Sequence, residues 1–154
     1  PCRIVDTRVP NAFQLAPRNT TPTPLTAYYP PSTETWWPGP YEPLNAVGIR
    51  VRLAPLYDNS RDCGIPTTAT GISVNVSVVN ASVVSYLTMW PTGATFPTVA
   101  IMIVGQNESV TSNSAIIPLG TYSAGNPDMY VRLTKGSGSG TGHLAVDVTG
   151  YLAP

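Results

Sequence analysis

Charged side chains are scarce in this sequence, and lysine is almost absent. Of the 154 residues, eight are Lys or Arg and eight are Asp or Glu, so 10% are charged, where about 25% is typical of a soluble domain. The formal net charge is zero, and Lys135 is the single lysine. Because phosphate recognition depends on clustered positive charge, this balance predicts that the chain binds neither nucleic acid nor an anionic membrane surface.

Histidine, cysteine and long apolar runs are also rare. His143 is the single histidine, and the two cysteines, Cys2 and Cys63, are too far apart for a CxxC motif. These residues are too few for a zinc site. The longest apolar runs, such as residues 99–104, are far shorter than the roughly 20 residues needed to cross a bilayer. We therefore expect no metal, no cofactor and no transmembrane segment.

The two cysteines favour a disulfide bond and a secreted protein. The chain contains 31 serines and threonines, very little lysine, and strand-like sequence from its first residues. These features are typical of a secreted chain whose signal peptide has been removed. A bond between Cys2 and Cys63 would close a loop of about 60 residues and stabilise the fold by roughly 4 kcal/mol. The alternative is a cytosolic protein with two buried free cysteines.

From about residue 46 onward, apolar and polar residues alternate in short β-branched stretches. In the clearest stretch, residues 71–80, the side chains of Ile72, Val74, Val76 and Val78 share one face. Clusters of Pro, Gly, Asn and Ser separate about eight such strands, which predicts one all-β domain over residues 1–154 with an antiparallel β-sandwich or jelly-roll-like fold. The expected strands are residues 3–6, 48–53, 71–80, 83–90, 98–104, 115–119, 129–133 and 143–148.

Residues 9–46 have a different composition from the rest. They hold nine of the 17 prolines and six of the 13 aromatic residues. Proline removes hydrogen-bond donors from a sheet, so we expect a Pro- and aromatic-rich N-terminal arm or long loop. Its aromatic content is too high for a disordered linker, so its own domain or another molecule must cover the rings. Core packing is one interpretation, and contact with a partner or a glycan is the other, through Tyr28, Tyr29, Trp36, Trp37 and Tyr41.

Two loops have compositions that occur in ligand sites. Residues 136–142, GSGSGTG, lack the Lys-Ser/Thr ending and the following helix of a phosphate-binding loop, so we expect a flexible hairpin connection. Residues 58–62, DNSRD, offer oxygen ligands for calcium, but Arg61 lies among them. Turns stabilised by Asn and Asp side chains are the preferred interpretation.

Three charged residues are candidates for polar anchors of the strands. Asp6 and Arg8 are two positions apart, so on a strand they share a face and can pair. Asp147 lies opposite the apolar side chains of its strand and can bind loop amides or arginines. No motif brings two carboxylates together, and His143 has no serine in a GxSxG motif. We therefore expect structural roles for Asp6, Arg8 and Asp147 and no enzymatic activity.

Six blocks of the sequence, taken in order, resemble a β-rich domain common in bacterial secreted and cell-surface proteins. They are CRIVDTR at residues 2–8, CGIP at 63–66, ATGISVNVSVVN at 69–80, SYLTMWPTG at 85–93, NSAIIPLG at 113–120 and HLAVDVTGYL at 143–152. In that family the domain is often appended to larger extracellular or wall-associated proteins. The resemblance implies a β fold, secretion, pairing of Cys2 with Cys63 and no catalytic role. Residues 9–46 are longer and richer in proline than the family pattern.

Together these features predict a non-enzymatic extracellular structural module of the cell surface. Its scarce charge removes long-range repulsion, and its arm could dock on a neighbouring copy by β-strand addition or by aromatic anchoring. Such head-to-tail contacts give a homo-oligomer or polymer, such as a surface filament or layer. The alternative is a carbohydrate-binding or adhesive module that uses Trp36, Trp37 and Tyr41 to hold a glycan or a cell-wall surface.

Overall fold

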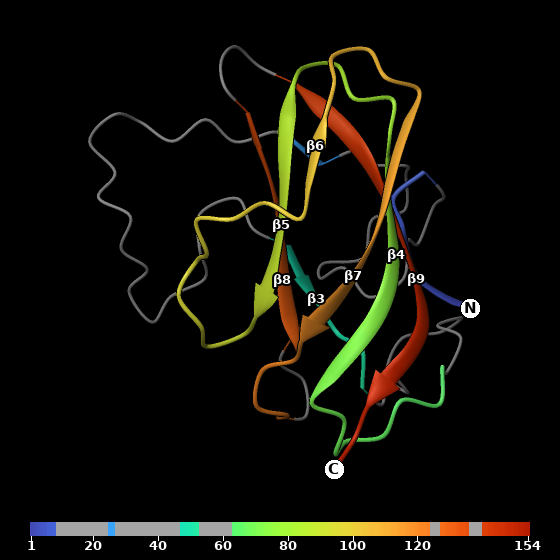
Figure 1. Ribbon diagram of the computed structural model, residues 1–154, viewed down its shortest axis with the longest axis vertical. Coiled ribbons are helices and arrows are strands. Elements are labelled where there is room, and N and C mark those ends of the chain that lie inside the picture. The colour runs from blue at the N-terminus through green and yellow to red at the C-terminus, as the bar shows by residue number, and fades with distance from the viewer. Residues whose placement is uncertain (9–24, 27–46, 53–62, 124–126, 136–139) are drawn as a thin grey trace.

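The computed structural model describes residues 1–8, 25–26, 47–52, 63–123, 127–135 and 140–154 (Figure 1). Within these ranges every regular element is a β-strand, and no helix is long and apolar enough to cross a membrane. The strands are β1 Cys2–Asp6, β2 Leu25–Thr26, β3 Val47–Ile49, β4 Gly71–Val79, β5 Ser85–Pro91, β6 Met102–Val104, β7 Val110–Pro118, β8 Met129–Lys135 and β9 Thr141–Leu152.

The strands form two antiparallel sheets. The first has the order β1-β9-β4-β7, with β2 also paired to β9, and the second has the order β3-β8-β5-β6. The pairs β1 with β9, β3 with β8, β4 with β7 and β5 with β6 are nested in the sequence and alternate between the two sheets. This nesting is the arrangement of a jelly roll. The predicted all-β sandwich is therefore confirmed, and Figure 1 shows β9, β4 and β7 beside one another in the first sheet.

The core lies between the two sheets and follows from the alternation in the strands. On β4, the side chains of Ile72, Val74, Val76 and Val78 are at most 1% exposed, while the residues between them are only partly buried. The second sheet contributes a matching set from β5 and β8, including Leu87, Val131 and Leu133. Burying each such side chain is worth about 1.5–3 kcal/mol relative to leaving it exposed.

The outer face of the second sheet is covered by an aromatic cluster. Trp90 on β5 is only 3% exposed, and its ring meets Phe96 edge-on at a centroid distance of 5.0 Å. Tyr130 on β8 lies 5.7 Å from Trp90, and the Arg132 guanidinium lies 3.6 Å from the Phe96 ring centre. The loop that follows β5 therefore closes over this sheet and buries rings that would otherwise meet water.

Two expectations about the strand connections differ from the structure. A hairpin is expected around residues 136–142, but β8 and β9 belong to different sheets, so these two strands do not pair with each other. Strand β7 begins at Val110 instead of near residue 115, because its first half is a polar edge segment that lacks apolar alternation. The alternation predicted strands in both regions, but it did not show which strand each one pairs with.

One short part of the predicted arm pairs with the sheet of its own domain. Leu25 and Thr26 form β2, and they lie opposite Gly142 and Thr141 at the start of β9. The remainder of residues 9–46 lies outside the described residues.

Candidate functional site

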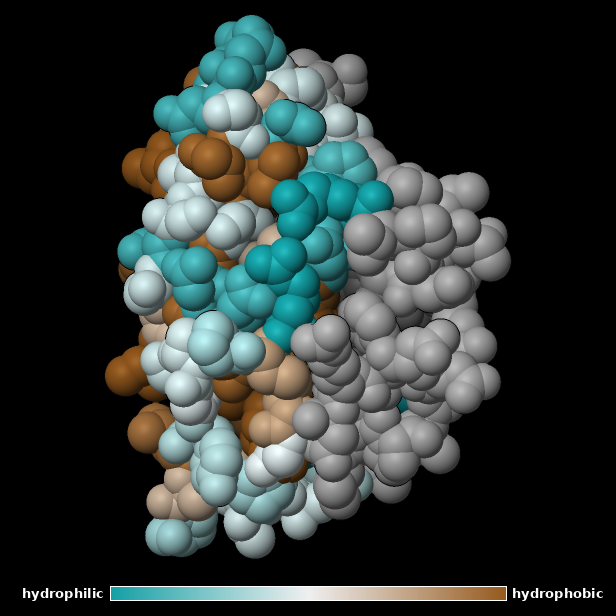
Figure 2. All heavy atoms as spheres, turned by 90° about the vertical axis from the view of Figure 1, so that its right-hand side faces the viewer, coloured by the Kyte–Doolittle hydropathy of each residue, from teal (hydrophilic) through white to brown (hydrophobic). Residues whose placement is uncertain are grey.

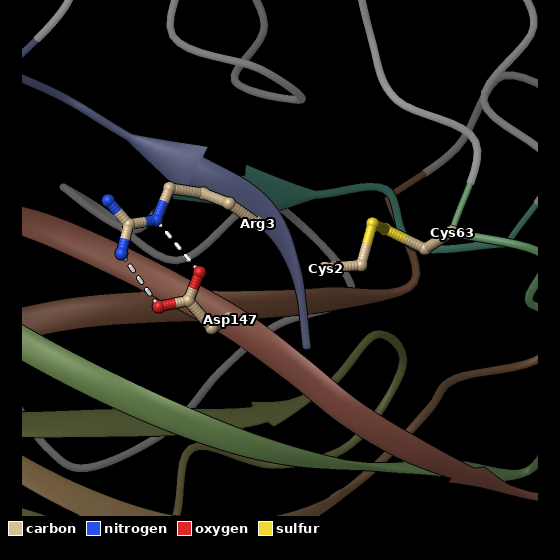
Figure 3. The surroundings of a disulfide bond; sticks show 4 residues. All are labelled: Cys2, Arg3, Cys63 and Asp147. Carbon is tan, nitrogen blue, oxygen red and sulfur yellow. Dashed lines mark hydrogen bonds and ion pairs between the residues drawn. A yellow bond between two sulfur atoms is a disulfide. The ribbon is translucent and has the colours of Figure 1, made fainter.

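The polar residues predicted as anchors gather where β1 lies against β9. Arg3 on β1 faces Asp147 on β9 in the strand register. Its guanidinium forms two parallel hydrogen bonds with this carboxylate, from Nε to Oδ1 at 2.8 Å and from Nη2 to Oδ2 at 2.7 Å (Figure 3). Hydrogen bonds from Arg3 lower the pKa of Asp147 below its ordinary value. This two-point contact fixes the register of the first strand on the last.

Asp6 is the centre of the same network. Arg8 donates from Nε to Oδ1 at 2.8 Å and from Nη2 to Oδ2 at 2.6 Å, and its backbone N–H also donates to Oδ1. Arg3 donates from Nη1 to Oδ2 at 2.9 Å. These bonds, with those from Arg8 dominant, lower the pKa of Asp6 from 3.8 to about 2. The carboxylate is therefore held ionised and saturated with donors, which is unsuited to proton transfer near neutral pH.

A bulge in β1 brings Arg3 and Asp6 to the same face. In a regular strand, residues three apart lie on opposite faces. The pairing of β1 with β9 shifts between Arg3 and Val5, and as a result Ile4 and Val5 are both buried, at 1% and 0% exposure. The extra residue turns Asp6 to the side of Arg3 and Asp147. Sequence spacing predicted that Asp6 and Arg8 could meet, but it contained no sign that Arg3 would join them.

His143 takes part in the attachment of the same strand end. Its Nδ1 donates to the backbone oxygen of Thr7 at 3.1 Å, because a carbonyl oxygen can only accept. The hydroxyl of Thr7, a residue with 1% exposure, accepts the Leu144 N–H at 2.9 Å. The imidazole is thus bound to a main-chain oxygen at the edge of the network, and none of the described serines donates to it.

The disulfide bond joins Cys2 on β1 to Cys63. Cys63 is the first residue of the segment 63–70, which leads into β4. The Cα atoms of the two cysteines are 5.7 Å apart, and 61 positions separate them in the sequence. Figure 3 shows this covalent link and the Arg3–Asp147 pair next to each other at β1. The first strand is therefore held by a covalent bond at one residue and by ion pairs at the next.

Sequence reasoning missed a second ion pair, between Arg52 and Asp128. Both side chains are 4% exposed. Arg52 donates to Asp128 Oδ1 from Nε at 2.9 Å and from Nη2 at 2.7 Å, and also to the backbone oxygens of Ala69 and Gly120. Asp128 Oδ2 accepts the N–H groups of Val51 and Arg52, at 2.6 and 2.9 Å. This pair connects the chain after β3 to the residue before β8 and satisfies backbone groups that would otherwise be buried without partners.

In the strand expected at residues 48–53, alternation puts Arg50 and Arg52 on one face, opposite the apolar side chains. The structure ends β3 at Ile49, so the period-two pattern no longer applies at Arg52, and its side chain turns inward. The only signal in the sequence is that Asp128 stands directly before the strand expected at residues 129–133. A carboxylate in such a position is too common to identify Arg52 as its partner.

The aromatic candidates for assembly or glycan binding cannot be placed. Tyr28, Tyr29, Trp36, Trp37 and Tyr41 all lie outside the described residues, and so does the acidic loop at residues 58–62.

The four sheet edges differ in length and charge. Strands β3 and β6 have three residues each, and β1 carries Arg3 and Asp6. Strand β7, VTSNSAIIP, has nine residues, none of them charged. Short strands and charged side chains are the usual means by which proteins prevent an edge from pairing with another chain. Among the described strands, β7 is the one edge that has neither protection.

The acidic side chains of the described residues do not gather into a cluster that could hold a metal ion. No three His, Cys, Asp or Glu side chains come together in this part of the chain. The carboxylates of Asp6, Asp128 and Asp147 are each bound to arginine. The arrangement fixes strands against one another and leaves one uncharged sheet edge open.

Comparisons with protein-family models, with curated protein sequences and with solved structures found no match to this chain.

Proposed function

We propose that the protein is a non-enzymatic extracellular structural module that self-associates, as the subunit of a surface filament or layer. The observation that carries this proposal is β7, a nine-residue sheet edge without a charged residue. An edge of this kind is a template for pairing with a further strand.

The charge distribution supports the same proposal. The chain has no net charge, so copies approach one another without the repulsion that keeps highly charged proteins apart. The described Asp residues are all occupied by internal ion pairs, so their charges do not oppose close packing. Both features favour contact between neutral surfaces of identical subunits.

The disulfide supports the extracellular part of the proposal. Bonds such as Cys2–Cys63 persist in oxidising compartments and are rare where thiols are kept reduced. A module exposed outside the cell also benefits from a covalent link that does not depend on pH or ionic strength.

Sedimentation velocity and negative-stain electron microscopy of the full-length protein test self-association directly. We expect oligomers or ordered polymers that grow with protein concentration. A Trp36→Ala/Trp37→Ala variant tests whether the arm contributes, with Trp36→Phe/Trp37→Phe as the control that keeps aromatic surface. A wild-type protein that remains monomeric at all accessible concentrations would contradict the proposal.

The alternative, a carbohydrate-binding or adhesive module, depends on the same aromatic residues. Aromatic faces stack on sugar rings, so binding to an insoluble polysaccharide should disappear in the Trp36→Ala/Trp37→Ala variant. Polysaccharide pull-down of the wild-type protein, the Ala variant and the Phe variant separates this activity from self-association. Retained polymer formation without any polysaccharide binding supports the first proposal alone.

A further inference from the structure

The outward-facing groups of β7 follow from its hydrogen bonds to β4. At one end of the ladder, the N–H of Asn80 donates to Ser109 O at 3.0 Å. At the other end, the N–H of Leu119 donates to Thr70 O at 2.9 Å. Antiparallel strands exchange these bonds at every second residue, so the odd-numbered residues from 109 to 119 bond to β4. The even-numbered residues between them direct their peptide groups away from β4. Pro118 has no N–H to donate, which leaves four residues that offer both main-chain groups: Val110, Ser112, Ser114 and Ile116.

These four residues, which we call the β7 edge, also share one face of the sheet. All four side chains are exposed, with Val110 at 56% and Ile116 at 66%. Apolar residues stand at the two ends of the set and serines in the middle. The set therefore has the same chemical order when it is traced in either direction.

We propose that the β7 edge pairs with the β7 edge of a second copy of the chain, antiparallel and with Asn113 opposite its counterpart. In this register Val110 faces Ile116 of the other copy, and Ser112 faces Ser114, each pair occurring twice about the symmetry axis. Each of the four pairs can exchange two main-chain hydrogen bonds. The two first sheets become one continuous sheet through a closed, isologous contact.

The side chains make a second copy the best occupant of this edge. Apolar residues meet apolar residues and hydroxyls meet hydroxyls, and each kind of cross-strand pair is favourable. No charge lies in the strand, so the two-fold axis brings no like charges together. The proposal deepens the proposed function, on which it rests, by naming the surface and the register of one contact. Because this contact is closed, growth into a filament or layer requires a second, different contact between the dimers.

One local hydrogen bond must be exchanged when the edges pair. Asn113 Oδ1 accepts the outward N–H of Ser114 at 2.9 Å, while Asn113 Nδ2 donates to Ile101 O. In the paired state the Ser114 N–H donates to a backbone oxygen of the second copy instead. Within the described residues, no other hydrogen bond occupies the outward main-chain groups of this edge.

The broad face of the first sheet is a poorer candidate for the contact. Figure 2 shows hydrophilic residues in the middle of this side of the molecule and hydrophobic residues in separate small groups. Docking through a sheet face depends on a contiguous apolar patch. Edge pairing depends on main-chain groups, and those are available along β7.

Two double variants test the register by charge. Ser112→Lys combined with Ser114→Lys places lysines opposite each other at both serine pairs, so we expect the dissociation constant of the dimer to rise about tenfold or more. Ser112→Lys combined with Ser114→Glu places opposite charges there and should keep the association. Both variants lose the same exposed Ser77–Ser112 hydrogen bond, so the loss of that bond does not contribute to the difference between them. Sedimentation velocity measures association, and circular dichroism verifies folding.

Cross-linking provides an independent test on an otherwise intact chain. In the proposed register, an Asn113→Cys variant brings the two new thiols together at a non-hydrogen-bonded pair, where a disulfide is geometrically allowed. Mild oxidation should give a covalent dimer on a non-reducing gel, with the linked peptide identified by mass spectrometry. Thr149→Cys, on the exposed outer face of β9, is the control: it keeps the β7 edge and should give no covalent dimer on the non-reducing gel.

The outcomes separate this inference from the proposed function. Wild-type assembly that the Lys/Lys variant does not weaken, together with no cross-link through position 113, overturns edge pairing and leaves self-association standing. Equal loss of association in both charge variants overturns the register. A wild-type protein that is monomeric at every concentration overturns the proposed function and this inference together.

Discussion

The two groups of ion pairs in this protein differ in how much water reaches them. Arg52 and Asp128 are 4% exposed, whereas the side chains of Arg3 and Arg8 are 42% exposed beside Asp6 and Asp147. The buried pair joins segments distant in the sequence and cannot lose one partner without stranding a charge. The exposed network lies on one strand pair and is screened by solvent. Both groups are arginine–carboxylate ion pairs, but removing one partner destabilises the fold more in the buried pair than in the exposed network, because water screens only the exposed charges.

The largest expected effect comes from breaking the buried pair. Asp128→Ala leaves the buried Arg52 guanidinium without its carboxylate and the Val51 N–H without its acceptor, and we expect a loss of about 3–5 kcal/mol in unfolding free energy. Asp147→Ala is the matched control, since its partner Arg3 is exposed, and it should cost no more than about 1 kcal/mol. Urea denaturation measures both. Equal losses in the two variants would show that burial does not distinguish the clusters.

Removing the disulfide tests how far the exposed network holds β1 by itself. Cys2→Ala combined with Cys63→Ala opens a loop of 61 residues, and chain-entropy arithmetic gives a loss of up to about 4 kcal/mol. Chemical reduction of the wild-type protein should have a similar effect on the denaturation midpoint. A loss below about 1 kcal/mol would mean that the ion pairs and the β1–β9 ladder are sufficient to hold this strand.

Acid titration has the smallest expected effect and isolates the exposed network. The pKa of Asp6 falls from 3.8 to about 2 in the folded protein, so its contribution is complete above about pH 5 and is lost as the pH falls through about 2. That shift corresponds to at most about 2 kcal/mol, and the lowered pKa of Asp147 acts in the same direction. Unfolding free energies measured between pH 2 and 6 should decline more gently in Asp6→Asn. An unchanged decline would contradict this account of Asp6.

The fold was predictable where alternation was regular. Residues 71–80 place every second side chain in the core, as β4 does, and turn-rich separators indicated about eight strands in a sandwich. The spacing of Asp6 and Arg8 led to the expectation that they could pair, and the structure has them in an ion pair at 2.6 Å. Such features are local, because they depend on neighbours within a few residues of the same strand.

The predictions that were wrong concern residues whose structure depends on segments distant in the sequence. Arg52 turns inward because Asp128, 76 positions away, supplies its acceptor. Strands β8 and β9 do not form a hairpin, because β9 pairs with β1 and β4 while β8 pairs with β3 and β5. The polar half of β7 forms a strand because β4 offers a complete ladder along it. Periodicity within one segment contains no information on these pairings.

The sequence by itself determined the class of the fold, the apolar faces of the main strands and the scarcity of charge, since composition and period-two alternation are properties of the chain alone. The tertiary structure decided which strands are neighbours, which ion pair is buried, where the β1 bulge turns Asp6 towards Arg3, and which edge remains open. Those properties arise because hydrogen-bond ladders and buried charges are satisfied across the fold, by partners that local sequence does not specify.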